Sequence, residues 1–189
     1  MRRLIALASI AALGAVAAFT AGSAGAAHRA ADQGFAGGGF VVNPTLPGDK
    51  RMRFEFAVRE SQTTGIVRGK NLTYRVQGYD SQWYVVHGTT LNSCSVTTTP
   101  GAYNGGGSFA GRGTLSTYNP FTFAETLVDG DVGYMVNGTD NADPGAGTDL
   151  VGVQFIDVDP LYAANVPDIA IDSVLSYGNV GVLVGPNFC

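Results

Sequence analysis

Apolar and polar side chains alternate with a period of two residues along most of this chain. Between residues 51 and 60, every second residue is large and apolar: Met52, Phe54, Phe56 and Val58. The segment 71–77 repeats the pattern with Leu72, Tyr74 and Val76. Such alternation is typical of a β-strand that turns one face to a core and the other to water.

Seven further runs are short, rich in β-branched or aromatic residues, and bounded by Gly, Pro, Asn or Asp: 81–91, 107–118, 121–128, 132–138, 149–158, 168–178 and 180–185. Asp129-Gly130 stands between two of them and predicts a hairpin turn. The segment 159–168 predicts at most one turn of helix. About nine strands predict an all-β fold, an antiparallel β-sandwich or jelly roll, with a barrel as the alternative.

The N-terminal 26 residues have the pattern of a secretory signal peptide. Arg2 and Arg3 precede an uncharged, alanine-rich run, and small residues follow up to a predicted cleavage after Ala26. We expect a flexible leader at 27–34 and a single β-sandwich domain at 35–189. No second apolar stretch approaches membrane length, so the exported chain is predicted to be extracellular, with no membrane span after cleavage.

Charge is divided unevenly along the chain. Loss of Arg2 and Arg3 with the signal peptide changes the net charge from −4 to −6. All remaining basic residues lie between Arg29 and Arg112, and acidic residues dominate after Arg112. A chain without a dense basic patch is a poor partner for nucleic acid. The acidic half either keeps a secreted protein soluble or attracts a divalent cation.

Two cysteines are present, Cys94 and Cys189. In an exported protein such a pair predicts one disulfide, which here would fasten residue 189 to the middle of the chain. Closing so long a loop stabilises a fold by roughly 4 to 5 kcal/mol. Free thiols or a bridge between molecules are the alternatives.

Several motifs together resemble uncharacterised β-rich domains of secreted bacterial proteins, the post-COAP type. They are "GGGF" near the start of the domain, "FEFAVRE" followed by "GKNLTYR", and "SFAGRGTL" leading to "DPGAGTDLVGVQFID". The resemblance covers roughly Phe35 to Val158. It implies a secreted β-sandwich, and it carries over no catalytic residues.

The Asp-rich stretch "TDNADPGAGTD" is the candidate metal site. It offers Asp140, Asn141, Asp143 and Asp149 as oxygen ligands for calcium, and its glycines allow backbone carbonyls to turn inward. Asp129 and Asp131 are possible further ligands. The spacing is not that of an EF-hand. The simpler interpretation is turn chemistry, because Asp, Asn and Pro-Gly stabilise turns through their own backbone.

Catalytic chemistry has few candidates. Asp157 and Asp159, two residues apart, are a possible carboxylate pair for a glycosidase. His87 lies in "WYVVHG", on the same strand face as Trp83 and Val85, and no nucleophile motif accompanies it.

Aromatic residues are the remaining candidates for ligand contact. They are Trp83, Tyr84, Tyr103, Tyr118 and Phe121, of which Tyr103 and Tyr118 fall in predicted loops. The sequence therefore predicts a non-catalytic structural or interaction domain whose partner is an extracellular protein or a polysaccharide. A carbohydrate- or polymer-binding module is the alternative, and a hydrolase is a weaker one.

Overall fold

The computed structural model describes residues 32–60, 67–98, 105–141 and 147–185. Nine strands and one helical turn follow in order: β1 (Asp32–Val42), β2 (Arg51–Glu60), β3 (Val67–Gln77), β4 (Trp83–Thr98), β5 (Gly105–Tyr118), β6 (Glu125–Asp140), β7 (Leu150–Ile156), α1 (Pro160–Ala163), β8 (Ile169–Val174) and β9 (Tyr177–Gly185). The all-β prediction is confirmed. β1 includes Asp32–Gly34, which the sequence analysis assigned to the leader.

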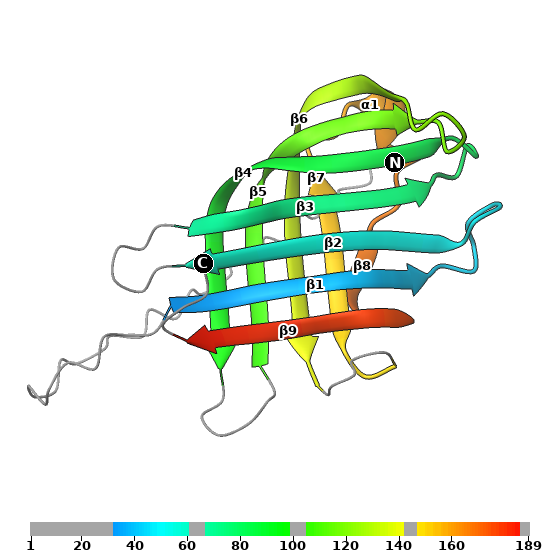
Figure 1. Cartoon of the computed structure of the whole chain (residues 1–189). Coiled ribbons are helices and arrows are strands. Elements are labelled where there is room, and N and C mark those ends of the chain that lie inside the picture. Colours follow the sequence, from blue (N-terminus) through cyan, green and yellow to red (C-terminus); the bar gives the residue numbers. More distant parts are fainter. Residues whose placement is uncertain (1–31, 61–66, 99–104, 142–146, 186–189) are drawn as a thin grey trace, which may run out of the picture.

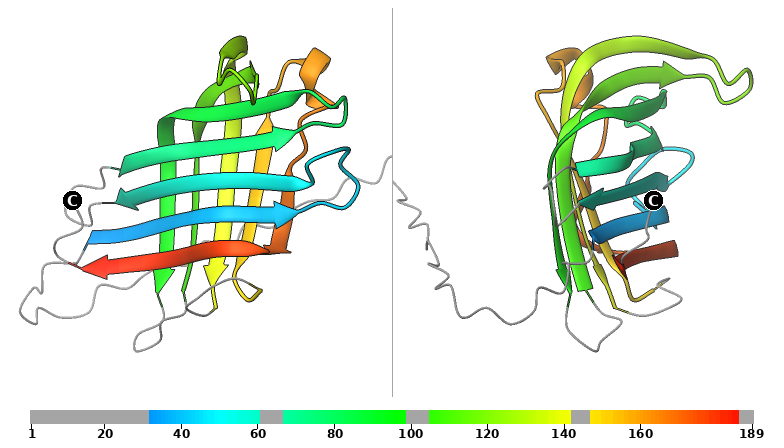
Figure 2. Two further views of the ribbon diagram at one scale, coloured as in Figure 1. Left: turned by 45° about the vertical axis from the view of Figure 1, so that its right-hand side comes forward. Right: turned by 60° about the vertical axis from the view of Figure 1, so that its left-hand side comes forward.

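All nine strands belong to one antiparallel sheet, in the order β8-β7-β6-β5-β4-β3-β2-β1-β9. The chain runs as a meander from β1 to β8, and β9 then returns to pair with β1. The sheet curls, so that β1, β2, β3 and β9 cross over β5, β6 and β7 (Figure 1). Figure 2 shows how the long strands β4, β5 and β6 bend from one direction to the other.

Glycines permit the bend. The β4–β5 pairing is irregular just after Gly88, opposite the segment that contains Gly111. The Tyr134 hydroxyl of β6 lies against both positions, 2.7 Å from where a Cβ on Gly88 would stand and 2.5 Å from one on Gly111. It donates a hydrogen bond to the carbonyl of Thr90 at 2.8 Å. A side chain at either glycine would displace this tyrosine, so the corner of the sheet requires glycine there.

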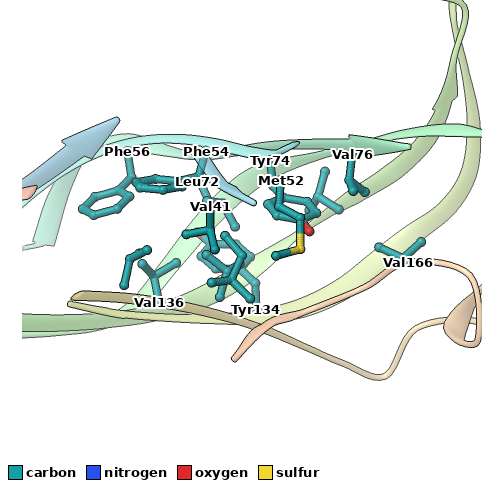
Figure 3. Packing of buried hydrophobic residues seen from close by; sticks show 14 of the residues in the cluster. Val41, Met52, Phe54, Phe56, Leu72, Tyr74, Val76, Tyr134, Val136 and Val166 are labelled. Atoms are coloured by element: carbon teal, nitrogen blue, oxygen red, sulfur yellow. The ribbon is translucent and has the colours of Figure 1, made fainter. Parts of the chain in front are cut away.

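The core lies between the two crossing parts of the curled sheet. The alternating side chains of β2 and β3 that the sequence singled out are all buried there, which confirms the prediction. Phe54 and Tyr74 face Tyr134 and Val136 of β6 across this core (Figure 3). Tyr74 also donates a hydrogen bond to the carbonyl of Pro167 at 2.6 Å, so its hydroxyl is satisfied although it is fully buried.

Two local predictions had different outcomes. The single helical turn is confirmed as α1, where the Asp159 side chain accepts a hydrogen bond from the backbone N–H of Leu161. The hairpin at Asp129-Gly130 is wrong, because β6 continues through both residues. Asp129 accepts backbone N–H groups from Asp131 and Asp159 instead, which stabilises an irregularity in β6 rather than a reversal.

No helix in the described part of the chain is long and apolar enough to cross a membrane.

Candidate functional site

A pocket of about 780 Å³ opens at the rim of the sheet, between the β3–β4 turn and the β5–β6 turn. Some of its lining residues are polar and uncharged, and the others are aromatic or apolar. They are Gln77, Ser81, Gln82, Trp83, Thr117, Tyr118, Asn119, Pro120, Phe121, Ala124 and Thr126. Neither a carboxylate nor an imidazole contributes to this lining. We call this feature the rim pocket.

Tyr118 forms the floor of the rim pocket. It is the last residue of β5, only 9% exposed, and its ring meets Trp83 edge to face at 6.5 Å between ring centres. The guanidinium carbon of Arg75 lies 4.3 Å from the centre of the Tyr118 ring. Arg53 makes a similar but longer contact with Trp83, at 5.8 Å. Both aromatic rings are therefore held in place by cation–π contacts on the outer face of the sheet.

The β5–β6 turn holds two exposed phenylalanines, of which Phe121 lines the rim pocket. Asn119 shapes the turn, because its side-chain oxygen accepts the backbone N–H groups of Phe121 and Thr122 at 2.9 and 3.2 Å. Phe121 is 90% exposed and Phe123 is 74% exposed. Figure 2 shows this hairpin extending beyond the neighbouring strands. A fixed turn thus presents two aromatic rings to solvent.

The backbone of Phe123 is in a left-handed conformation, with φ of 59°. That region suits glycine and asparagine, and it costs a bulky residue about 1 to 3 kcal/mol. The ring of Phe123 recovers a contact with Tyr118 at 6.5 Å between ring centres. A strained aromatic residue that remains largely exposed points to a role in contacting another molecule rather than in stability.

Asp49 anchors the arginines on one side of the site. Its carboxylate accepts hydrogen bonds from Arg51 at 2.8 and 2.9 Å and from Arg53 at 2.7 Å. The hydrogen bond from Arg51, together with that from Arg53, holds the pKa of the Asp49 carboxyl well below its usual range despite partial burial. Arg53 is thereby fixed over the ring of Trp83.

The predicted calcium ligands make turn contacts in the structure. Asp149 is fully buried, and its two oxygens accept the backbone N–H groups of Asn141 and Val180, each at 2.9 Å. The Asn141 amide donates to the carbonyl of Thr148 at 2.7 Å. Asp140 ends β6, and Asp143 lies outside the described residues. Within the described ranges no group of three His, Cys, Asp or Glu side chains could hold a metal ion.

The predicted catalytic residues also have structural partners. Asp157 pairs with Arg112, which also pairs with Asp131, and Asp159 caps α1. His87 lies on the outer face of the sheet, within 3.0 Å of the Glu125 carboxylate. The structure places none of these groups in the lining of the rim pocket.

The other candidate residues are three tyrosines that the sequence indicated for ligand contact and the two cysteines. Tyr84 faces the core, and its hydroxyl donates to Asp80 at 2.6 Å. Tyr118 was expected in an exposed turn, whereas β5 extends to include it and the cation–π contact covers it. Cys94 lies half-buried in β4. Tyr103 and Cys189 lie outside the described residues, so the disulfide and the Tyr103 contact stay predictions.

Three aromatic residues of this site, Trp83, Tyr118 and Phe121, are among the candidates for ligand contact that the sequence indicates. The sequence does not indicate that they lie at one pocket. Two residues were not predicted, Phe123 and Arg75. The exposure of Phe123 depends on the geometry of one turn. A partial signal existed for Arg75, because it stands on the polar face of β3 at the position that alternates with Tyr74.

The chain matches no protein-family model, no curated protein and no solved structure.

Proposed function

We propose that this protein is an exported, non-catalytic binding domain, and that the rim pocket binds a carbohydrate polymer. The signal-peptide pattern and the resemblance to secreted bacterial domains support the extracellular placement. The crossing of β1–β3 over β5–β7 supports a sandwich-like packing within the single curled sheet.

The observation that carries the proposal is the combination of groups at the pocket. Sugar rings offer apolar C–H faces and a rim of hydroxyl groups. Trp83 and Phe121 line the pocket and supply aromatic surface for these faces. Phe123, exposed on the same turn as Phe121, adds a further ring next to the lining. Amides such as Gln82 and Asn119 supply donors and acceptors for the hydroxyls. Binding sites for small ligands commonly combine apolar walls with a few polar groups in this way.

A hydrolase is disfavoured because general acid–base catalysis needs a titratable pair facing the substrate. The carboxylates proposed for that role, Asp157 and Asp159, lie instead against Arg112 and the start of α1. His87 pairs with Glu125, outside the pocket lining.

An interaction domain for another protein is the second candidate. It is favoured by one observation, the two exposed phenylalanines at the tip of a projecting hairpin. Large exposed aromatic residues are frequent anchors in protein interfaces.

Affinity electrophoresis through gels that contain different polysaccharides tests the proposal. We expect retardation by at least one polysaccharide, and its loss in Phe121→Ala. That side chain is almost fully exposed, so its removal should leave the melting temperature unchanged. The matched control is Leu161→Ala on α1, an apolar residue that is 76% exposed and remote from the pocket lining. Equal retardation of both variants and the parent protein would contradict the proposal.

A further inference from the structure

Side chains from five neighbouring strands form one row on the outer face of the sheet. Strand pairing places Tyr177 of β9 opposite Phe40 of β1, Phe40 opposite Arg53, Arg53 opposite Arg75, and Arg75 opposite Val85 of β4. We call these five residues the outer row. Val85 is fully buried, so the accessible members are the other four, and three strand spacings, about 14 Å, separate Tyr177 from Arg75. This accessible part of the row is long enough to contact more than one unit of a polymer.

A second pocket of about 360 Å³ lies along the outer row. Tyr177 and Phe40 are stacked at its wall, with 5.6 Å between ring centres, and Arg53 and Arg75 also line it. The same two arginines lie over Trp83 and Tyr118 of the rim pocket. The two pockets thus share a boundary made of two arginine–aromatic pairs.

Arg75 has no anionic partner among the described residues. No ion pair joins it to a described carboxylate, and its Nε is buried without a hydrogen-bond acceptor. Arg53 has one carboxylate, Asp49, which it shares with Arg51, and its Nη1 is likewise buried without a partner. These two buried atoms are out of reach of a ligand. The positive charge of Arg75 is nevertheless not neutralised by any described carboxylate, so this guanidinium can attract an anionic group in the second pocket that it lines.

We propose that the ligand is an acidic polysaccharide lying along the outer row, with its carboxylate or sulfate groups at Arg75 and Arg53. This inference rests on the proposed function and specifies its substrate class. Aromatic surface stacks on sugar rings at Tyr177, one end of the outer row, and at Trp83, which Arg53 of the row contacts. The guanidinium groups between them bind the anionic substituents, which arginine does through paired N–H donors.

The negative charge of the whole protein means that a polyanion can bind only at a local cationic site. The chain carries a net charge of −4 and has an isoelectric point of about 4.9, so a polyanion is repelled by most of its surface. Glu55 also lines the second pocket and opposes an anion at that point. Binding of a polyanion by so acidic a chain therefore requires a local cationic site, and the outer row provides one.

The test measures binding of three probes to the purified protein by isothermal titration calorimetry. Polygalacturonate carries carboxylates only, dextran sulfate carries sulfates only, and dextran is neutral. We expect at least one anionic probe to bind at least tenfold more tightly than dextran. Arg75→Gln should weaken that binding about tenfold or more. Lys50→Gln, which removes one exposed positive charge outside both pockets, should change it less than twofold.

Arg75→Lys serves as a second variant if Arg75→Gln fails to fold, because it keeps the charge and loses the forked donor geometry. It should weaken binding of the anionic probe to an intermediate degree. Equal effects of Arg75→Gln and Lys50→Gln would overturn the inference, as would binding of neutral dextran as tight as that of the charged probes. Neither result would by itself contradict carbohydrate binding at the rim pocket. Absence of binding by every probe overturns the inference. Whether the rim pocket binds a carbohydrate at all is tested separately, by the polysaccharide gels with Phe121→Ala.

Discussion

The guanidinium carbon of Arg75 lies 4.3 Å from the centre of the Tyr118 ring, and this contact joins β3 to the floor of the rim pocket on β5. Tyr118→Leu removes the aromatic face and its contacts with Trp83 and Phe123. We expect it to lower the free energy of unfolding by about 1 to 3 kcal/mol. Tyr118→Phe keeps the ring and should cost less than 1 kcal/mol. Denaturation by urea measures both, and equal stability of the two variants would show that the ring contributes nothing.

The left-handed backbone at Phe123 predicts an unusual order of stability. Phe123→Ala and Phe123→Gly both remove the ring, but only glycine relieves the conformation with φ of 59°. We expect Phe123→Gly to be more stable than Phe123→Ala by about 0.5 to 1 kcal/mol, whereas in an ordinary strand alanine is favoured. Thermal unfolding of the two variants gives the comparison. If alanine is the more stable residue, the turn does not have this backbone.

The same two variants separate binding from stability. Both lack the exposed aromatic ring, so both should retain less affinity for the polysaccharide than the parent protein does. Gel retardation of either variant equal to that of the parent would remove Phe123 from the binding surface.

Asp49 gives the stability of the protein a defined dependence on pH. Its pKa in the folded protein is lowered from 3.8, chiefly by the hydrogen bond from Arg51, so the unfolded chain takes up its proton first as the pH falls. Its contribution is therefore complete above about pH 5, declines below about pH 4, and disappears as the pH falls through the lowered pKa. We expect Asp49→Asn to cost about 1 to 3 kcal/mol at pH 7 and progressively less below pH 4.

Unfolding by urea at several pH values measures this effect. The control is Asp172→Asn, an exposed carboxylate on a left-handed backbone that asparagine also accepts. A difference between the parent protein and Asp49→Asn that stays constant from pH 7 to pH 2 would exclude the proposed role of the ion pairs.

Asp149 distinguishes a turn from a calcium site. Asp149→Ala leaves the buried N–H of Val180 and that of Asn141 without their acceptor, so we expect a loss of about 2 to 4 kcal/mol in EDTA as well as in calcium. A calcium site with a dissociation constant near 10⁻⁴ M would add roughly 3 to 6 °C to the melting temperature at 1 mM calcium. Asp143→Ala should abolish that shift if the predicted site exists. Thermal unfolding in EDTA and in calcium tests both expectations.

The sequence predicts strand content and the buried faces of β2 and β3 well, because a period of two depends only on local backbone geometry. The signal for α1 was likewise local, since Asp159 and Pro160 stand where a helix begins. The hairpin at Asp129-Gly130 was wrong for a non-local reason. Asp159, thirty residues later, supplies an N–H to Asp129, and β6 remains paired with β5 at Asp129.

The binding site was predictable only in part. Trp83, Tyr118 and Phe121 are recognisable as candidate aromatic residues, but no local pattern says that β4 and β5 bring them to one rim. The outer row is even harder to predict from the sequence. Its members come from five strands between residues 40 and 177, and only the register of three strand pairs aligns Arg75 with Phe40 and Tyr177.

Trp83 permits the most direct measurement, because it is the only tryptophan of the chain and it lines the rim pocket. Its fluorescence should change in a saturable way as the polysaccharide that retards the protein in gels is added. Quenching by acrylamide should fall at the same ligand concentrations, since a bound sugar covers the indole. Phe121→Ala should shift this titration to higher concentrations. Retardation in gels without any change in Trp83 emission or quenching would place the ligand elsewhere and contradict the rim pocket as the binding site.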